Sequence, residues 1–465
     1  MAAVPGDDRF GVADVLPAFF VLVVGALFGG SMIFLTPPFN VPDEMGHWLR
    51  TYQCSLGKVH ASRNGDVVGG ELPVSLQEIY LATLDPARTD AEINVSTGKI
   101  REALAIPLDR GRRQWFAFAA MARYSPVPYL PAAAAVRIGR LCRLTPLRLF
   151  YLGRAGTLIG YLLLVVAAVW LVPVHKWTLV LLALMPMSIF LAASLSPDAL
   201  SIALSFLGIA MILRLALRSG KIGRGSLWFL GAVLLLVGLA KPAYVALALL
   251  VLLIPNDRFA DPRQRWRIRA LLLGLPLAVS VAWVLSLPGL SVPVRPCVDI
   301  KAQACWMLGH PWLYTKVMME KITEPYLYSG IVATLGWGSI FLAPAIYTVY
   351  WTALLATAVL DGSREYVRLS LATRAASVAV YFLVMVLIAT LTYLTWQAVG
   401  DQDLHGIQSR YFVPVLPLLL LPLRGGARWA SSRFSQRLVP AMAIAAVMVG
   451  VGATWQTMIA WHYWR

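Results

Sequence analysis

Residues 37–50 read PPFNVPDEMGHWLR and follow directly on the first long apolar segment, residues 15–35. The prolines keep the approach extended, because the residue before a proline is disfavoured in the α region. From Asp43 onward the sequence can be helical, and in a helix Asp43, Glu44 and His47 share one face at i,i+3 and i,i+4 spacing. The stretch therefore places an acidic pair and a histidine where the chain leaves the first apolar segment. An ordinary N-terminal helical turn, whose acids suit the positive end of the helix dipole, is the competing interpretation.

The rest of the chain has the composition of a membrane protein. Hydrophobic residues make up 59% and charged residues 14% of the chain, whereas about a quarter of the residues in soluble proteins are charged. We expect an all-α polytopic membrane protein with about eleven transmembrane helices and a large helical first extracytoplasmic loop, because apolar runs long enough to span a bilayer recur throughout. The expected spans are residues 15–35, 148–171, 177–195, 199–217, 226–240, 242–255, 268–287, 331–359, 375–398, 411–423 and 438–460.

Positive charge is concentrated in short loops between these spans. The formal net charge is +17, and arginines gathered in cytoplasmic loops are what the positive-inside rule produces. No basic segment is interleaved with aromatic residues in the manner of nucleic-acid binding, so we expect no nucleic-acid partner. The loops alternate consistently if residues 125–141 lie on the membrane surface, which places the N-terminus in the cytoplasm. The expected regions are residues 1–36 with the first helix, 37–147 as an extracytoplasmic loop with interfacial helices, 148–287 as a transmembrane bundle, 288–330 as a second extracytoplasmic loop, and 331–465 as a C-terminal transmembrane bundle.

All four cysteines fall on the extracytoplasmic side of this topology. Cys297 and Cys305 are close enough in sequence to form a local disulfide, and Cys54 with Cys142 is a second conceivable pair, because an oxidising compartment allows both. Four unpaired thiols are the alternative.

The polar side chains near the apolar spans gather on one face of the membrane in this topology. They are Asp43, Glu44 and His47 after the first span, then Asp198, Lys241, Tyr244, Gln408, Arg410 and Tyr411. A charge at membrane depth costs a few kcal/mol unless it is paired or hydrated, so such residues commonly mark a site. Simpler interpretations exist: Asp198 can cap a helix, Lys241 can snorkel to the interface, and Arg410 can anchor the membrane edge.

This set of side chains suits the transfer of a sugar from a lipid phosphate. Carboxylates and a histidine can deprotonate a hydroxyl or hold a divalent cation such as Mg²⁺ or Mn²⁺. Lysine and arginine can hold a phosphate, and the spans beneath them can hold a long apolar tail. The sequence contains no glycine-rich phosphate loop, G-x-S-x-G elbow or zinc signature.

An ordered set of short motifs carries a family resemblance. The motifs are Pro42-Asp43-Glu44 with His47, Tyr124-Ser125-Pro126-Val127-Pro128-Tyr129, Ser196-Pro197-Asp198-Ala199-Leu200, Lys241-Pro242 with Tyr244, Gly336-Trp337, and Gly406 with Gln408, Arg410-Tyr411-Phe412 and Pro414. From about residue 36 to residue 423, the chain resembles a bacterial family of predicted membrane proteins of unknown function. That family is in turn similar to the GT-C class of integral-membrane glycosyltransferases. Two positions depart from the pattern: Ser409 stands where glycine is expected, and Gly338-Ser339 follow Trp337 where an acid is expected.

The resemblance implies a multi-span helical fold, a polyprenyl-phosphate sugar as donor, and an acidic residue of the first loop at the catalytic centre. Carried over by position, Asp43 is the base on the acceptor hydroxyl, Glu44 and His47 bind a cation or position Asp43, and Asp198 matches the second acidic position. The expected site residues are thus Asp43 and Glu44 as catalytic groups, His47, Asp198, Lys241, Tyr244, Gln408, Arg410 and Tyr411 as substrate-binding groups, and Asp43, Glu44 and His47 as ligands of any divalent cation.

The expected function is an inverting glycosyltransferase in a bacterial inner membrane. It would pass a sugar from polyprenyl phosphate to an envelope glycan or lipid acceptor on the extracytoplasmic face. A transporter or flippase of lipid-linked glycans, a polysaccharide polymerase, and a non-catalytic scaffold are the alternatives.

Overall fold

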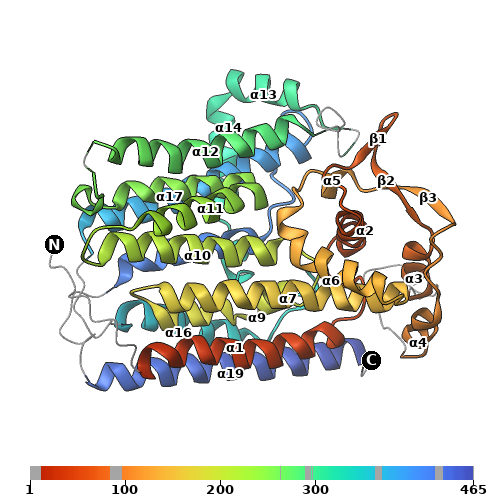
Figure 1. Ribbon diagram of the computed structural model, residues 1–465, viewed down its shortest axis with the longest axis horizontal. Coiled ribbons are helices and arrows are strands. Elements are labelled where there is room, and N and C mark those ends of the chain that lie inside the picture. Colours follow the sequence, from red (N-terminus) through yellow and green to blue (C-terminus); the bar gives the residue numbers. More distant parts are fainter. Residues whose placement is uncertain are drawn as a thin grey trace.

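The computed structural model describes residues 12–83, 97–261, 263–287, 295, 297–361, 369–424 and 433–463. Most helices lie side by side along the long axis of the molecule, and a small sheet lies at one end (Figure 1). Six of the described helices are long and apolar enough to cross a membrane. They are α1 (Val12–Leu35), α7 (Pro146–Leu171), α10 (Asp198–Leu217), α12 (Arg265–Leu285), α17 (Leu371–Trp396) and α19 (Arg433–Tyr463). The expected all-α membrane architecture is confirmed, and the count of about eleven spans stays a prediction.

Shorter apolar segments lie among these long helices. They are α11 (Arg224–Ala240), η2 (Pro242–Leu253), α16 (Pro344–Leu360), and the run formed by η4 (Ser409–Val415), α18 (Leu416–Leu420) and η5 (Leu421–Leu423). The expected span 177–195 is divided into α8 (Lys176–Ala183) and α9 (Pro186–Ala192). Pro186 begins the second helix, because a proline has no N–H to donate to the preceding turn.

The expected span 331–359 is wrong in its first third. Helix α16 begins only at Pro344. Before it, Gly336 and Gly338 adopt left-handed backbone angles, with φ of 58° and 92°, which interrupt any helix. The apolar side chains of Ile331 and Val332 are fully buried against other parts of the chain. Their hydrophobicity therefore reflects burial in the protein core, which a hydropathy pattern does not separate from burial in lipid.

The first large loop contains a sheet as well as the expected helices. Its helices are α2 (Glu44–Ser55), α3 (Ser75–Thr83), α4 (Thr97–Ala105), α5 (Ala119–Ala122), η1 (Val127–Tyr129) and α6 (Leu130–Leu141). Its antiparallel strands are β1 (Ser62–Asn64), β2 (Val67–Pro73) and β3 (Arg113–Ala117), in the order β1-β2-β3. The β1–β2 hairpin turns at Gly65, whose φ is 58°. Asn64 pairs with Val67 across the turn, so the hairpin loop is Gly65-Asp66, and a glycine at the first loop position supplies the positive φ that such tight turns need.

A hydrophobic core of its own joins this loop to the bundle. The Trp48 ring of α2 lies edge-on to Phe150 of α7, with centroids 5.6 Å apart, and both side chains are fully buried. Helix α6 packs against α2 and α7. Its 12 residues extend about 18 Å, which is less than the hydrocarbon thickness of about 30 Å. The contact of Trp48 with Phe150 and the packing of α6 against α7 therefore attach the loop to the start of α7.

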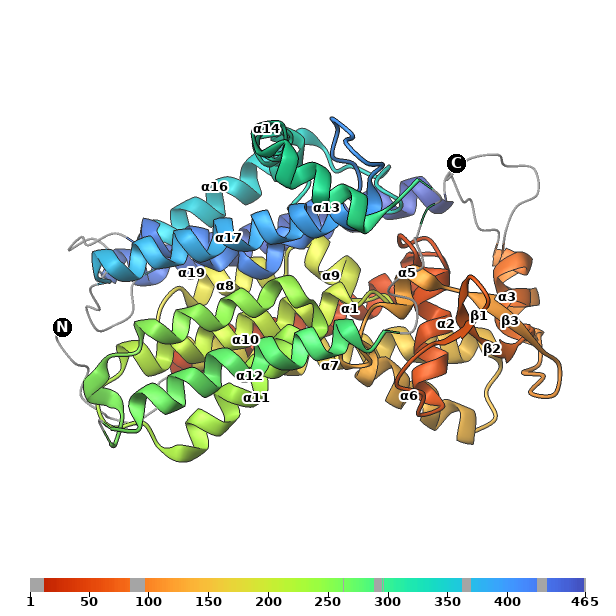
Figure 2. The ribbon, with the colours of Figure 1, turned by 90° about the horizontal axis from the view of Figure 1, so that it is seen from above.

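The remaining described helices complete the outer parts of the molecule. They are η3 (Asn256–Arg258), α13 (Ile300–Gly309), α14 (Pro311–Ile322) and α15 (Pro325–Ser329). Helices α13 and α14 lie against α17 (Figure 2). All four cysteines are free thiols in the structure, so neither of the two conceivable disulfides is formed.

Candidate functional site

Asp198 is the centre of a buried group of charges at the end of the bundle that carries the sheet. Its Oδ1 accepts a hydrogen bond from Lys241 Nζ at 3.2 Å, and its Oδ2 accepts one from Arg410 Nε at 2.8 Å. The three side chains are 5%, 15% and 10% exposed, respectively. Asp198 begins α10, Lys241 joins α11 to η2, and Arg410 lies in η4. The structure therefore brings together three residues that are far apart in the sequence.

The contacts of these residues differ from those that helix capping by Asp198 and snorkelling by Lys241 would give. Both carboxylate oxygens of Asp198 accept hydrogen bonds from side chains outside its own helix. Lys241 is held by the Asp198 carboxylate, and its ammonium lies 3.5 Å from the ring centroid of Tyr411. A cation over an aromatic face is stabilised by the ring quadrupole, more so when the pair is desolvated. Tyr244 donates its hydroxyl to the Tyr411 carbonyl at 2.7 Å, which fixes the backbone next to Arg410.

Asp43 is the exposed carboxylate of the predicted set. It precedes α2 with left-handed backbone angles, φ 62° and ψ 11°, so the expectation that it shares a helix face with Glu44 and His47 is not met. Burial by its surroundings raises the pKa of Asp43, Arg410 lowers it, and Asp198 raises it. Asp43 is therefore within electrostatic reach of Arg410 and Asp198. Aspartate adopts this conformation more readily than most non-glycine residues, because its short polar side chain can hydrogen-bond locally.

His47 is a buried, neutral side chain beside these charges. Its Nδ1 lies 2.8 Å from the Tyr129 hydroxyl, and its ring meets Tyr124 edge-on with centroids 5.9 Å apart. Burial lowers the pKa of His47 to about 3, with a small opposing effect of Asp198. Burial also raises the pKa values of Tyr124 and Tyr129 well above the ordinary tyrosine value. Both tyrosines belong to the motif at residues 124–129, which the sequence-based site did not include.

Glu44 is turned away from this site. Its carboxylate is paired with Arg154 of α7 through Nε to Oε1 at 2.9 Å and Nη2 to Oε2 at 2.6 Å, and neither side chain is exposed. No substrate can reach Glu44, so it does not have the geometry of a catalytic group. Arg154 was missed, although an arginine in the interior of the apolar run 148–171, six residues beyond the Arg148 that begins it, is itself a signal of a buried polar contact.

The expected cation ligands do not form a metal site. Within the part of the chain that the structure describes, no three or more His, Cys, Asp or Glu side chains are grouped to hold a metal ion. The physical reason is that Glu44 is committed to Arg154, while Asp43 lies outside the helix that carries Glu44 and His47. Gln408, just before Arg410, is half-buried, and its Oε1 is buried with no hydrogen-bond partner among the described residues.

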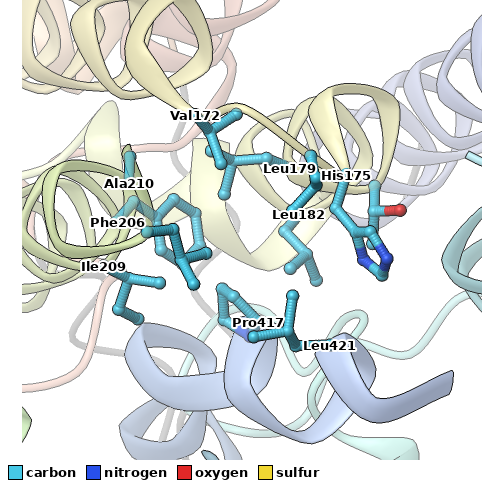
Figure 3. Close-up of a pocket in the computed structure, with 12 residues that line it drawn as sticks. Val172, His175, Leu179, Leu182, Phe206, Ile209, Ala210, Pro417 and Leu421 are labelled. Atoms are coloured by element: carbon cyan, nitrogen blue, oxygen red, sulfur yellow. The ribbon is translucent and has the colours of Figure 1, made fainter. Parts of the chain in front are cut away.

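A small cavity elsewhere in the bundle contains none of the predicted site residues. It has a volume of about 20 Å³ and is lined mostly by apolar side chains, among them Leu179, Phe206 and Pro417 (Figure 3). His175 and Thr178 are its buried polar members, and Nε2 of His175 has no hydrogen-bond partner among the described residues. The volume suits about one water molecule, so the cavity is too small for a sugar or a lipid tail.

Comparisons with known proteins identify the family of the chain. No functionally curated protein and no solved structure matches it. A family described as "Predicted membrane protein (DUF2142)" matches residues 26–419, which include every residue of the site described above. The chain therefore belongs to the DUF2142 family of predicted membrane proteins.

Proposed function

We propose that this protein is a GT-C-like glycosyltransferase with eleven or so membrane-spanning segments. It moves a sugar from a polyprenyl-phosphate donor to an envelope glycan or lipid acceptor, with inversion at the anomeric carbon. One observation carries this function: Asp43, an exposed carboxylate, lies within electrostatic reach of the buried Asp198–Lys241–Arg410 group at one end of an apolar bundle.

The charges of this group favour a phosphate ligand. Lys241 and Arg410 share the single carboxylate of Asp198, so one positive charge is left in excess. Arg410 bonds Asp198 through Nε, and a guanidinium has five N–H donors in all, so others can bind phosphate oxygens.

The reaction uses Asp43 as general base. The Asp43 carboxylate takes the proton of the acceptor hydroxyl, and the oxygen forms a bond to the anomeric carbon. The bond from that carbon to the lipid phosphate breaks, and its electron pair goes to the phosphate oxygen, which Arg410 and Lys241 stabilise. Burial raises the pKa of Asp43, which brings its basicity closer to the operating pH, as general-base catalysis requires.

The proposed orientation places this site outside the cytoplasm of a bacterial inner membrane. The loop that joins α10 to α11 lies at the end of the bundle opposite the sheet (Figure 1). That loop carries Arg218 and Lys221, and Arg224 begins α11 directly after it; such basic loops face the cytoplasm. Helix α1 begins at the same end (Figure 1), so the donor head group would meet Asp43 on the extracytoplasmic face.

Purified protein in proteoliposomes tests this function, with a panel of polyprenyl-phosphate sugars and a glycan or lipid acceptor. Asp43→Asn is expected to lower turnover at least about a hundredfold, because general-base help contributes two to four decades in rate. The matched control is Asp66→Asn in the same loop, since Asp66 is 99% exposed on the hairpin turn; its activity should equal the wild type. Near-full transfer by Asp43→Asn would remove Asp43 from this role. Donor translocation without transfer would instead indicate a flippase, and a ladder of long products a polymerase.

A further inference from the structure

The Glu44–Arg154 pair is fully buried and so cannot touch a substrate. Both oxygens of Glu44 are bound by Arg154, at 2.9 Å and 2.6 Å. Removing two charges from water is costly, and apolar residues of similar volume often serve stability equally well. The contacts that the pair makes beyond itself indicate what else it does.

Arg154 fixes the exit of α1. Its Nη1 donates to the carbonyls of Ile33 and Thr36 at 2.9 Å and 2.6 Å, and its Nη2 donates to Pro37 at 3.0 Å. The last carbonyls of a helix have no partner within the helix. Arg154 bonds that of Ile33 in the last turn of α1 together with two carbonyls just beyond α1, so one guanidinium links the end of α1 to the start of the stretch that leads to Asp43.

Glu44 ties this stretch to the turn before α10. Its Oε1 also accepts the backbone N–H of Leu195 at 3.2 Å, and Leu195 lies three residues before Asp198. Glu44 directly follows Asp43 in the chain, so the hydrogen bonds that hold the Glu44 carboxylate also restrain the backbone at Asp43. The pair therefore holds both segments that carry the acidic residues of the site.

We propose that Glu44 and Arg154 are a positioning pair that sets Asp43 against the Asp198–Arg410 group. This role rests on the proposed transferase function, and it replaces the direct catalytic role expected for Glu44. Neither residue binds donor or acceptor; each acts through the backbone segments at residues 33–43 and 195–198.

The test compares Glu44→Met/Arg154→Met with Arg269→Met. The double variant removes both charges together and keeps unbranched side chains of similar length, so no unpaired charge is left buried. Arg269 is a matched control, because it is also a buried arginine that bonds a carbonyl, that of Ile254, and the Asn256 side chain, away from the site. If the double variant does not fold, Arg154→Lys replaces it, since a lysine keeps the charge but cannot form the two parallel hydrogen bonds of a guanidinium to a carboxylate.

Each variant is measured for hydrogen–deuterium exchange, for turnover and its pH profile, and for binding of polyprenyl phosphate. Hydrogen–deuterium exchange should increase in residues 36–47 and 194–198 of the double variant and stay at the wild-type level there in Arg269→Met. Turnover should fall about a hundredfold, as small misplacements of reacting groups do, while binding of polyprenyl phosphate is retained. The acid limb of the rate profile should move to lower pH, because a displaced Asp43 loses the burial that raises its pKa; simple destabilisation would lower the active fraction without moving that limb.

Unchanged exchange in both segments, with the wild-type turnover and acid limb, would overturn the positioning role. Faster exchange in both segments of a protein whose wild type transfers no sugar would overturn the transferase function and leave the structural coupling in place. The two failures are therefore distinguishable.

Discussion

Asp43 differs from the other acids of the site in the exposure of its side chain, which is only partly covered by its surroundings. Burial raises its pKa and Asp198 adds to the effect, while Arg410 opposes it. A base must be deprotonated to act, so transfer is expected to fall on acidification at a pH above the ordinary aspartate range. A pH profile of kcat/KM checks this, with Asp43→Asn lacking that limb. A wild-type rate that stays constant down to the ordinary aspartate range would contradict it.

His47 makes the stability of the folded protein depend on pH, because its pKa differs between the folded and unfolded states. Its pKa is about 3 in the folded state and about 6.5 when unfolded, so the unfolded state binds more protons between these values. Stability is therefore lost as pH falls below about 6.5 toward about 3. We expect the apparent melting temperature to fall less steeply over this range in His47→Asn than in the wild type. His175 contributes in the same sense, so only the difference between the two proteins reports on His47, and parallel curves would contradict its burial as a neutral group.

The hydrogen bond between His47 and Tyr129 is a second residue-scale test. Tyr129→Phe leaves His47 Nδ1 buried without its partner at 2.8 Å, and an unsatisfied buried polar group costs about 1–3 kcal/mol. Thermal unfolding of the detergent-solubilised protein should show this loss. Tyr463→Phe is a comparison, because the hydroxyl of Tyr463 in α19 donates to the carbonyls of Phe34 and Leu35 at the end of α1 and is exposed to solvent. An unchanged melting temperature in Tyr129→Phe would contradict the contact.

At the scale of the elements, strands β2 and β3 lie so close together that only glycine fits at position 69 of β2. A Cβ on Gly69 would lie 1.8 Å from the Phe116 carbonyl oxygen, so Gly69→Ala must displace the strands, at a cost of about 1–3 kcal/mol. Gly111→Ala is the control, because its Cβ would meet only Asp109 Oδ1 at 3.5 Å. Limited proteolysis of the first loop should be faster in Gly69→Ala alone. Equal cleavage of the two variants would contradict the observed strand pairing.

The elements show which features hydropathy can predict. Long spans such as α7 and α17 were predicted to within a few residues, because about 18 apolar residues or more in a row favour a transmembrane helix. Residues 331–343 were misassigned, since burial in protein and burial in lipid give the same hydropathy. The helix break at Pro186 is marked by the proline itself, and the hairpin after Asn64 is marked by Gly65. Hydropathy does not report either signal.

At the scale of the whole molecule, the sequence could suggest the site but not its contacts. The topology placed Asp198, Lys241 and Arg410 on one face, and the structure joins them. Helix spacing alone predicts that the side chains of Asp43 and Glu44 lie on one helix face. In the structure, Asp43 has left-handed backbone angles and precedes the helix, and the Glu44 side chain forms an ion pair with Arg154. Such pairings depend on which helices are neighbours, and a single sequence does not contain that information.

The orientation of the whole molecule is tested by labelling. In a background without other cysteines, the exposed Cys142 at the site end should react with an impermeant maleimide on intact cells. Gly225→Cys at the start of α11, where a side chain meets open space, should react only after permeabilisation. Labelling of both positions from the same side of the membrane would contradict the proposed topology.

The most direct measurement is an experimental structure of the protein in a lipid bilayer with polyprenyl phosphate added. The phosphate is expected against Arg410 and Lys241, with the Asp43 carboxylate on the side from which an acceptor hydroxyl would arrive. A lipid phosphate bound only at the arginine-rich end of the bundle, with the Asp198 group unoccupied at saturating lipid, would contradict the account.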